Sequence, residues 1–154
     1  MHWLIDIVTN PFLITSIASW FVAQLMKTII YAIINKKIDL HWMFSDGAMP
    51  SAHSATVCSL AAISGFICGF DTFQFAATTI LAIIVCHDAM GVRREAGKQA
   101  VVLNELIKAF DELGSTEKLP EVKLKEFVGH TPVQVVAGIL VGIVNAILMY
   151  LILF

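Results

Sequence analysis

Four long apolar stretches, separated by polar segments, dominate the pattern of the chain. They cover residues 11–34, 50–70, 73–90 and 131–154. Crossing a hydrocarbon core of about 30 Å takes about 20 helical residues, so each stretch is long enough, or nearly long enough, to span a bilayer. Only two residues separate the second stretch from the third, which predicts a tight helical hairpin. The pattern predicts an all-α, polytopic membrane helical bundle with about four transmembrane helices, forming a single domain over residues 1–154.

The segment 91–130 is the one extended polar part of the chain. Apolar residues within it follow the i, i+3, i+4, i+7 spacing of an amphipathic helix, namely Leu103, Leu106, Ile107 and Phe110. Gly114 then supplies a helix stop. We expect this insert to carry an amphipathic helix that lies on the membrane or caps the bundle, followed by a shorter helix near residues 122–128. The alternative is a solvated connector.

Composition agrees with a membrane protein and argues against other classes. Hydrophobic residues make up 58% of the 154 residues and charged residues 14%, with a net charge of -2. That balance argues against a nucleic-acid partner, because phosphate-binding surfaces normally carry a basic excess. The cysteines Cys58, Cys68 and Cys86 lie in apolar stretches without a CxxC spacing, so we interpret them as packing residues.

The placement of the basic residues predicts the orientation of the helices. Lys27, Lys36 and Lys37 lie near the end of the first stretch, and the other seven basic residues fall between Arg93 and Lys125. With four spans, both groups lie on the same side of the membrane. Basic residues in short loops mark the cytoplasmic side. We therefore expect an integral protein of a bacterial cytoplasmic membrane, with the insert in the cytoplasm and both termini outside.

Four polar groups converge on that same predicted face. They are Lys27, the turn Pro50-Ser51-Ala52-His53, the run from Asp88 to Arg94, and His130 with Gln134. Ionisable residues near transmembrane segments are costly, which favours a functional interpretation. Each group also has a structural alternative, since a lysine can snorkel, a serine can cap a helix, arginines can flank a span and an interfacial histidine can be incidental.

The chemistry of these groups fits a phosphate ester. Lys27 offers a point charge for an anion, and Ser51 opens a helix whose free amides attract phosphate. Arg93 and Arg94 bind phosphate bidentately, or alternatively pair with Asp88. His130 can attack phosphorus or relay protons, with Gln134 one turn onward to orient it, while His53 protonates the leaving oxygen. The scheme needs neither a metal nor another cofactor.

Three runs of sequence together resemble the divergent branch of the PAP2 superfamily, the type-2 phosphatidic acid phosphatases related to vanadium haloperoxidases. The runs are GAMPSAHSA, DAMGVRREAGKQA and GHTPVQVVAG, and the resemblance extends from about Lys27 to Gly142. It implies that His130 is a nucleophile forming a phosphohistidine and His53 a general acid. It further implies that Lys27, Ser51 and an arginine bind the phosphate.

The chain departs from the family pattern at three positions. Leu124 stands where an arginine is expected before the nucleophile, which leaves Arg93 or Arg94, or more weakly Lys125, to replace it. Gln134 stands where an acid is expected after His130, and Asp88 is a possible substitute. The arginine that usually follows the first lysine is also missing, with Lys36 or Lys37 the nearest basic residues.

From these patterns we expect a membrane phosphatase that removes phosphate from a lipid phosphate monoester or pyrophosphate. The first alternative is a non-catalytic binder or transporter of a lipid phosphate, and the second is a structural membrane subunit. The expected partners of the protein are the lipid phosphate substrate and membrane lipids. Gly138 and Gly142 form a small-residue surface suited either to packing within the chain or to a homo-oligomer.

Overall fold

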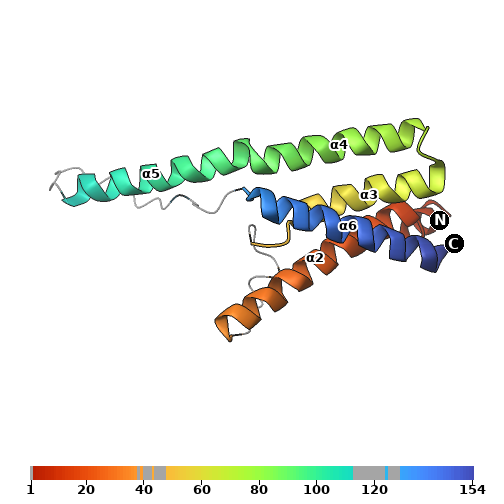
Figure 1. Ribbon diagram of the computed structural model, residues 1–154, viewed down its shortest axis with the longest axis horizontal. Coiled ribbons are helices and arrows are strands. Elements are labelled where there is room, and N and C mark those ends of the chain that lie inside the picture. Colours follow the sequence, from red (N-terminus) through yellow and green to blue (C-terminus); the bar gives the residue numbers. More distant parts are fainter. Residues whose placement is uncertain (1, 38, 40–42, 44–47, 113–123, 125–128) are drawn as a thin grey trace.

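The computed structural model describes residues 2–37, 39, 43, 48–112, 124 and 129–154. All regular secondary structure in these residues is helical: α1 (His2–Val8), α2 (Pro11–Asn35), α3 (Ala52–Cys68), α4 (Phe73–Met90), α5 (Val92–Glu112) and α6 (Pro132–Leu153). Figure 1 shows α2, α3, α4 and α6 gathered in a bundle, with α5 projecting beyond it.

Three described stretches are long and apolar enough to cross a membrane, and a fourth is slightly short. The three are Pro11–Asn35, Phe73–Phe110 and Pro132–Leu153, and the shorter apolar helix is Ala52–Cys68. Many large apolar side chains on the outer faces are exposed, as expected where lipid is the solvent. The prediction of an all-α membrane bundle is therefore confirmed, with α3 the shortest of its apolar helices.

Local chemistry explains where the bundle helices begin. The side chains of Asn10, Ser51, Thr72 and Thr131 each accept a hydrogen bond from a backbone N–H in the first turn of the helix that follows. Such caps satisfy amides that have no partner within the helix. Pro11 and Pro132 occupy the first turns of α2 and α6, where proline loses no intrahelical hydrogen bond.

Helix α3 is the centre of the bundle, since it packs against α2, α4 and α6. Its contact with α6 depends on two glycines. A Cβ atom on Gly138 would lie 2.4 Å from the Ser51 carbonyl oxygen, and one on Gly142 would lie 2.4 Å from the Ala55 carbonyl oxygen. The small-residue surface of α6 is therefore used for close packing within the chain. Farther along, the Asn145 amide donates to the Ser19 hydroxyl at 2.6 Å and ties α6 to α2.

The polar groups gather at one end of this bundle. Helix α4 ends there, α3 and α6 begin there, and Lys27 lies on the nearby part of α2. We call this the polar end and define it by Lys27, residues 50–54, residues 88–94 and residues 129–134. Helix α1 and the last turn of α6 lie at the opposite end (Figure 1).

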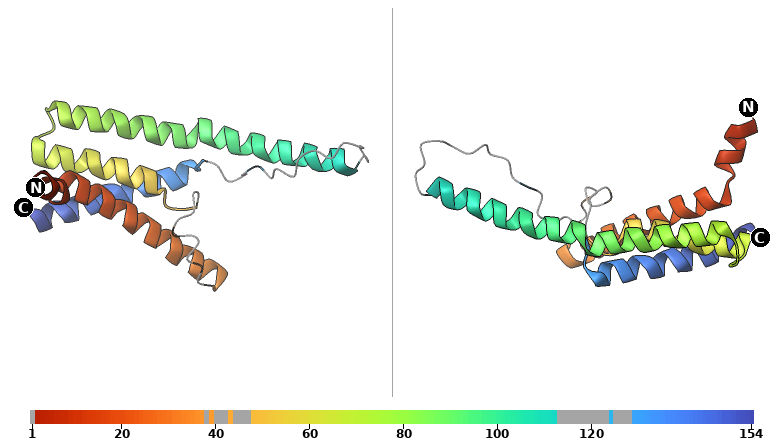
Figure 2. Two further views of the ribbon diagram at one scale, coloured as in Figure 1. Left: turned by 180° about the vertical axis from the view of Figure 1, so that it is seen from behind. Right: turned by 90° about the horizontal axis from the view of Figure 1, so that it is seen from above.

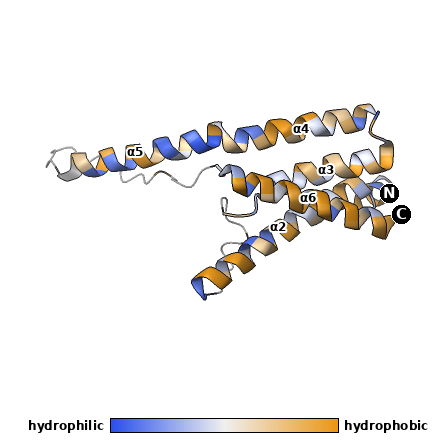
Figure 3. Ribbon diagram, viewed as in Figure 1, coloured by the Kyte–Doolittle hydropathy of each residue, from blue (hydrophilic) through white to orange (hydrophobic). Residues whose placement is uncertain are grey.

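The insert between α4 and α6 contains the predicted helix, α5. It continues the line of α4 away from the bundle instead of folding over the polar end (Figure 2). Figure 3 shows the change from the mostly apolar α4 to the mixed polar and apolar surface of α5. The Asn104 side chain holds the main chain of Leu124 through two hydrogen bonds of 3.0 Å. Leu124 is not helical, and the rest of the helix predicted near residues 122–128 lies outside the described residues.

Candidate functional site

The polar end is assembled by two backbone hydrogen bonds between segments that are distant in sequence. The amide of Ser51, before α3, donates to the carbonyl of Gln134 in α6 at 3.0 Å. The amide of His130 donates to the carbonyl of Ala89 in α4 at 2.9 Å. These bonds bring the predicted segments around Ser51, Asp88 and His130 together, as the sequence predicted.

Gly129 sets the approach of His130 to the predicted arginines. Its φ is +92°, a conformation that glycine adopts readily and other residues rarely. A Cβ atom there would lie 2.4 Å from the Arg94 amide nitrogen and 2.6 Å from the Arg93 carbonyl carbon. The main chain before His130 therefore lies directly against the start of α5, an approach that requires glycine. His130 itself is buried, with 8% of its surface exposed.

Ser51 is fully buried and caps α3. Its hydroxyl oxygen accepts from the Ser54 amide at 3.3 Å and from the Ser54 hydroxyl at 3.0 Å. A serine hydroxyl has two acceptor positions and one O–H donor, so these two bonds leave the Ser51 proton available to an anion. The amides that open α3 are beside it, where the helix dipole favours negative charge.

Lys27 is buried in the protein, with only 2% of its surface exposed. Ala23, one turn earlier on α2, packs against Ala52 and Ala55 of α3. Because residues four apart share a helix face, Lys27 lies on the same face, one turn nearer the start of α3. Lys27 is therefore covered by protein and does not lie along the lipid-exposed surface of the bundle. Its role as a charge for a bound phosphate stays a prediction.

His53 lies at the outer edge of the polar end, because its side chain is exposed. It shares a face of α3 with Val57, one turn onward, and Val57 packs against the cluster of Cys86, Ala89 and Val135. His53 is therefore on the side of α3 near the end of α4. Its role as general acid stays a prediction.

The arginine run contains an ion pair that the sequence analysis gave as an alternative. The Arg93 Nε atom lies 2.6 Å from a carboxylate oxygen of Asp88, and both side chains are well exposed. Arg94 is exposed too. Farther along α5, Lys98 pairs with Glu95 at 2.6 Å, and this hydrogen bond lowers the pKa of the Glu95 carboxyl. Asp88 thus holds Arg93 in the structure.

Gln134 has a structural role in addition to the predicted one. Its side-chain oxygen accepts from the Thr131 amide at 2.9 Å, while its own amide donates to the Thr131 hydroxyl at 3.4 Å. This reciprocal pair is a capping box. The Gln134 side-chain oxygen therefore helps to start α6, and the Gln134 carbonyl holds Ser51. Its role in orienting His130 stays a prediction.

Sequence reasoning missed three residues of this site. Ser54 is fully buried between Ser51 and Gly138, and Gln24 is a buried amide on α2 near Lys27. Gly129 makes the close approach described above. Ser54 and Gly129 stand within the family-like runs GAMPSAHSA and GHTPVQVVAG, which was a signal for both. The capping role of Gln134 also had a signal, since Thr131-x-x-Gln134 matches the capping-box pattern.

The remaining predicted residues lie away from the polar end or outside the described residues. Lys36 and Lys37 are exposed and follow α2 where it diverges from the other helices (Figure 1). Lys125 lies outside the described residues. Within the described part of the chain, no group of three His, Cys, Asp or Glu side chains is arranged to hold a metal ion. All three cysteines have free thiols.

Comparison with known proteins places the chain in a family. The model of the "Divergent PAP2 family" matches residues 8–145. A relative from Bacillus subtilis (strain 168), named "Uncharacterized membrane protein YuiD", is 39% identical over 146 residues, which cover 90% of this chain and 92% of the relative. No solved structure matches the chain. With its apolar helices and this match over nearly its whole length, the chain is an integral membrane protein that belongs to the divergent PAP2 family.

Proposed function

We propose that the protein is a metal-independent phosphatase of lipid phosphate monoesters or pyrophosphates, working at the polar end. The observation that carries the proposal is the backbone contact of Gly129 and His130 with residues 89–94. In this contact the backbone beside a buried histidine lies against the segment that carries two arginines, at the end of the bundle that also contains Lys27 and Ser51. Histidine with several cations is the composition expected for phosphoryl transfer without a metal.

The phosphate would be bound by cations and by the start of α3. Lys27 supplies a buried charge, and the Ser51 hydroxyl can donate its proton to a phosphate oxygen. Arg94 or Arg93 binds from the exposed side, where the headgroup enters. These donors stabilise the charge that builds up on the equatorial oxygens in the transition state.

The reaction would proceed in two steps. A ring nitrogen of His130 attacks phosphorus, a P–N bond forms and the bond to the leaving oxygen breaks, while His53 donates a proton to that oxygen. Water then attacks the phosphohistidine, the P–N bond breaks and His53 takes the proton from the water. Phosphate leaves and both histidines return to their starting states. The exposure of His53 suits proton exchange with solvent.

The test is phosphate release from lipid phosphates by the purified protein in detergent, with and without a chelator. We expect chelator-resistant release that His130→Ala abolishes. His87→Ala is the matched control, because His87 is an exposed histidine in the last turn of α4 and has no role in the mechanism. Full activity in His130→Ala would refute the phosphohistidine mechanism, and loss of activity on adding chelator would refute metal independence.

A non-catalytic binder or transporter of lipid phosphates is the second candidate. It is favoured by Gln134, which occupies the family's acid position and is held in the capping box. This function predicts headgroup binding without turnover. That binding survives His130→Ala and weakens with Arg93→Ala or Arg94→Ala. Binding that disappears with His130→Ala would argue against it.

A further inference from the structure

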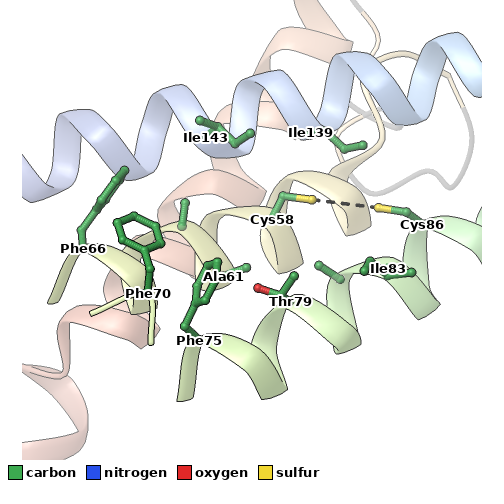
Figure 4. Close-up of a pocket in the computed structure, with 12 residues that line it drawn as sticks. Cys58, Ala61, Phe66, Phe70, Phe75, Thr79, Ile83, Cys86, Ile139 and Ile143 are labelled. Atoms are coloured by element: carbon green, nitrogen blue, oxygen red, sulfur yellow. Dashed lines mark hydrogen bonds between the residues drawn. The ribbon is translucent and has the colours of Figure 1, made fainter. Parts of the chain in front are cut away.

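An apolar groove of about 430 Å³ lies between α3, α4 and α6 (Figure 4). Cys58, Cys86 and Ile139 line it near the polar end, and Phe66, Phe70 and Phe75 line it near the α3–α4 hairpin. Ile83 on its wall is 59% exposed, so the groove opens sideways toward the surrounding bilayer. This feature lies outside the residues assigned to phosphate binding and catalysis.

One end of the groove lies close to the polar end. Cys86, at its head, belongs to the same packed cluster as Ala89, whose carbonyl accepts the hydrogen bond from the His130 amide. Cys58 and Cys86 face each other there, with 4.0 Å between their sulfur atoms. The end of the groove at Cys86 therefore lies about one helical turn from the backbone that holds His130.

We propose that this groove holds one hydrocarbon chain of the lipid whose phosphate is bound at the polar end. That the bound headgroup is a phosphate rests on the proposed function. That a hydrocarbon chain occupies the groove rests on the shape, the lining and the nearby charges of the groove. Its lining is apolar apart from Thr79 and the two thiols. The cations Lys27, Arg93 and Arg94 belong to the polar end, the end of the bundle toward which Cys86 lies.

The size of the groove fits a single hydrocarbon chain. From Phe75 to Cys86 the wall formed by α4 is about 16 Å long, roughly half of a hydrocarbon core of about 30 Å. The volume falls within the range of about 300–1,000 Å³ common for small-molecule sites.

The first experiment fills the groove and measures chain-length preference. Ala82 lines the groove and is 7% exposed, whereas Ala77 is exposed on another side of α4. With lipid phosphates of one headgroup and increasing chain length, we expect Ala82→Phe to lower kcat/KM for long chains and to spare the shortest. Ala77→Phe should keep the wild-type profile. The same dependence of kcat/KM on chain length in both variants would overturn the proposal.

The second experiment uses the unaltered protein and does not depend on turnover. Vesicles of phosphatidylcholine would contain a phosphatidic acid probe with a photoreactive diazirine in one chain, or the same chain on a choline headgroup. We expect the phosphatidic acid probe to label peptides that contain groove residues of α3 and α4 more strongly than the choline probe does. Equal labelling by both probes would mean that any bilayer chain fills the groove, which overturns the proposal.

The two proposals fail in different ways. If no lipid phosphate is hydrolysed but the phosphatidic acid probe still labels the groove more strongly than the choline probe, the phosphatase function is refuted and the chain-binding groove is supported. If hydrolysis is confirmed but labelling ignores the headgroup and Ala82→Phe behaves like Ala77→Phe, the groove is refuted and the phosphatase stands.

Discussion

At the residue scale, the ion pair of Asp88 with Arg93 sits where an incoming headgroup would compete for the guanidinium. The Arg93 side chain is 57% exposed and the Asp88 side chain 38% exposed. Exposed pairs contribute about 0–1 kcal/mol, because water screens the charges and ordering two side chains costs entropy. The pair is therefore weak enough to open, and its main effect is on the availability of Arg93.

We predict that Asp88→Asn tightens lipid phosphate binding and leaves the thermal stability nearly unchanged. Removing the carboxylate frees Arg93 and lowers the negative charge near the phosphate. Headgroup binding and Tm measured in detergent test this. Glu95→Gln is the control, because it breaks the Lys98 pair on α5 and should change neither quantity. Weaker binding or lost turnover in Asp88→Asn would mean that the carboxylate acts directly in the reaction.

Two substitutions of Gln134 distinguish its capping role in α6 from a role in catalysis. Glutamate preserves the capping box because its carboxylate also accepts from the Thr131 amide, whereas alanine removes that bond. We expect Gln134→Ala to lower stability by about 0.5–2 kcal/mol, as for other lost caps, and Gln134→Glu to match the wild type in Tm and phosphate release. A large gain in release with Gln134→Glu would instead show that an acid here assists His130.

At the element scale, α6 and α3 approach through backbone contact at two glycines. Each carbonyl of α3 that faces Gly138 or Gly142 occupies the space a side chain would need. Because both partners are backbone within helices, neither can move aside without separating the helices. The same contact holds Ser51 beside Gln134, so helix packing and site geometry depend on each other.

We predict that Gly142→Ala destabilises the protein by about 1–3 kcal/mol, the usual cost of overpacking. Val144→Ile adds one carbon to an exposed position of the same helix and should have little effect. Thermal unfolding in detergent compares the two variants, and size-exclusion chromatography with light scattering follows their oligomeric state. A change in oligomeric state without a fall in Tm would show that the glycines pack against another copy.

At the scale of the whole molecule, the even number of bundle helices places both chain ends opposite the polar end. The basic residues predict that the polar end and α5 face the cytoplasm. Helix α5 then extends from the membrane along the line of α4, carrying its charges into water (Figure 3). Substrate would come from the cytoplasmic leaflet.

Single cysteines and an impermeant maleimide test this orientation in intact cells. With the native thiols replaced, Lys98→Cys on α5 should react only after the membrane is permeabilised. Phe154→Cys, at the exposed end of the chain, should react directly. The reverse pattern would place the site on the outer face and the substrate in the outer leaflet.

The sequence by itself determined the helical class, the approximate spans and the meeting of the polar segments at one end. Hydropathy and capping residues are local properties of the sequence. The number of membrane crossings then decides which helix ends lie on the same side of the membrane. The family resemblance was equally available, because it depends on motifs such as Pro50-Ser51-Ala52-His53 and their order. The match over residues 8–145 confirms it.

Only the tertiary structure decided how these segments touch. The burial of Lys27, the capping role of Gln134, the close approach of Gly129 to Arg94 and the groove beneath the site all depend on how each helix is rotated about its axis. A helix that is apolar on nearly every side gives little indication of which face meets a neighbour, because lipid and protein favour the same residues. That rotation is set by packing, above all by where glycine lets two backbones meet.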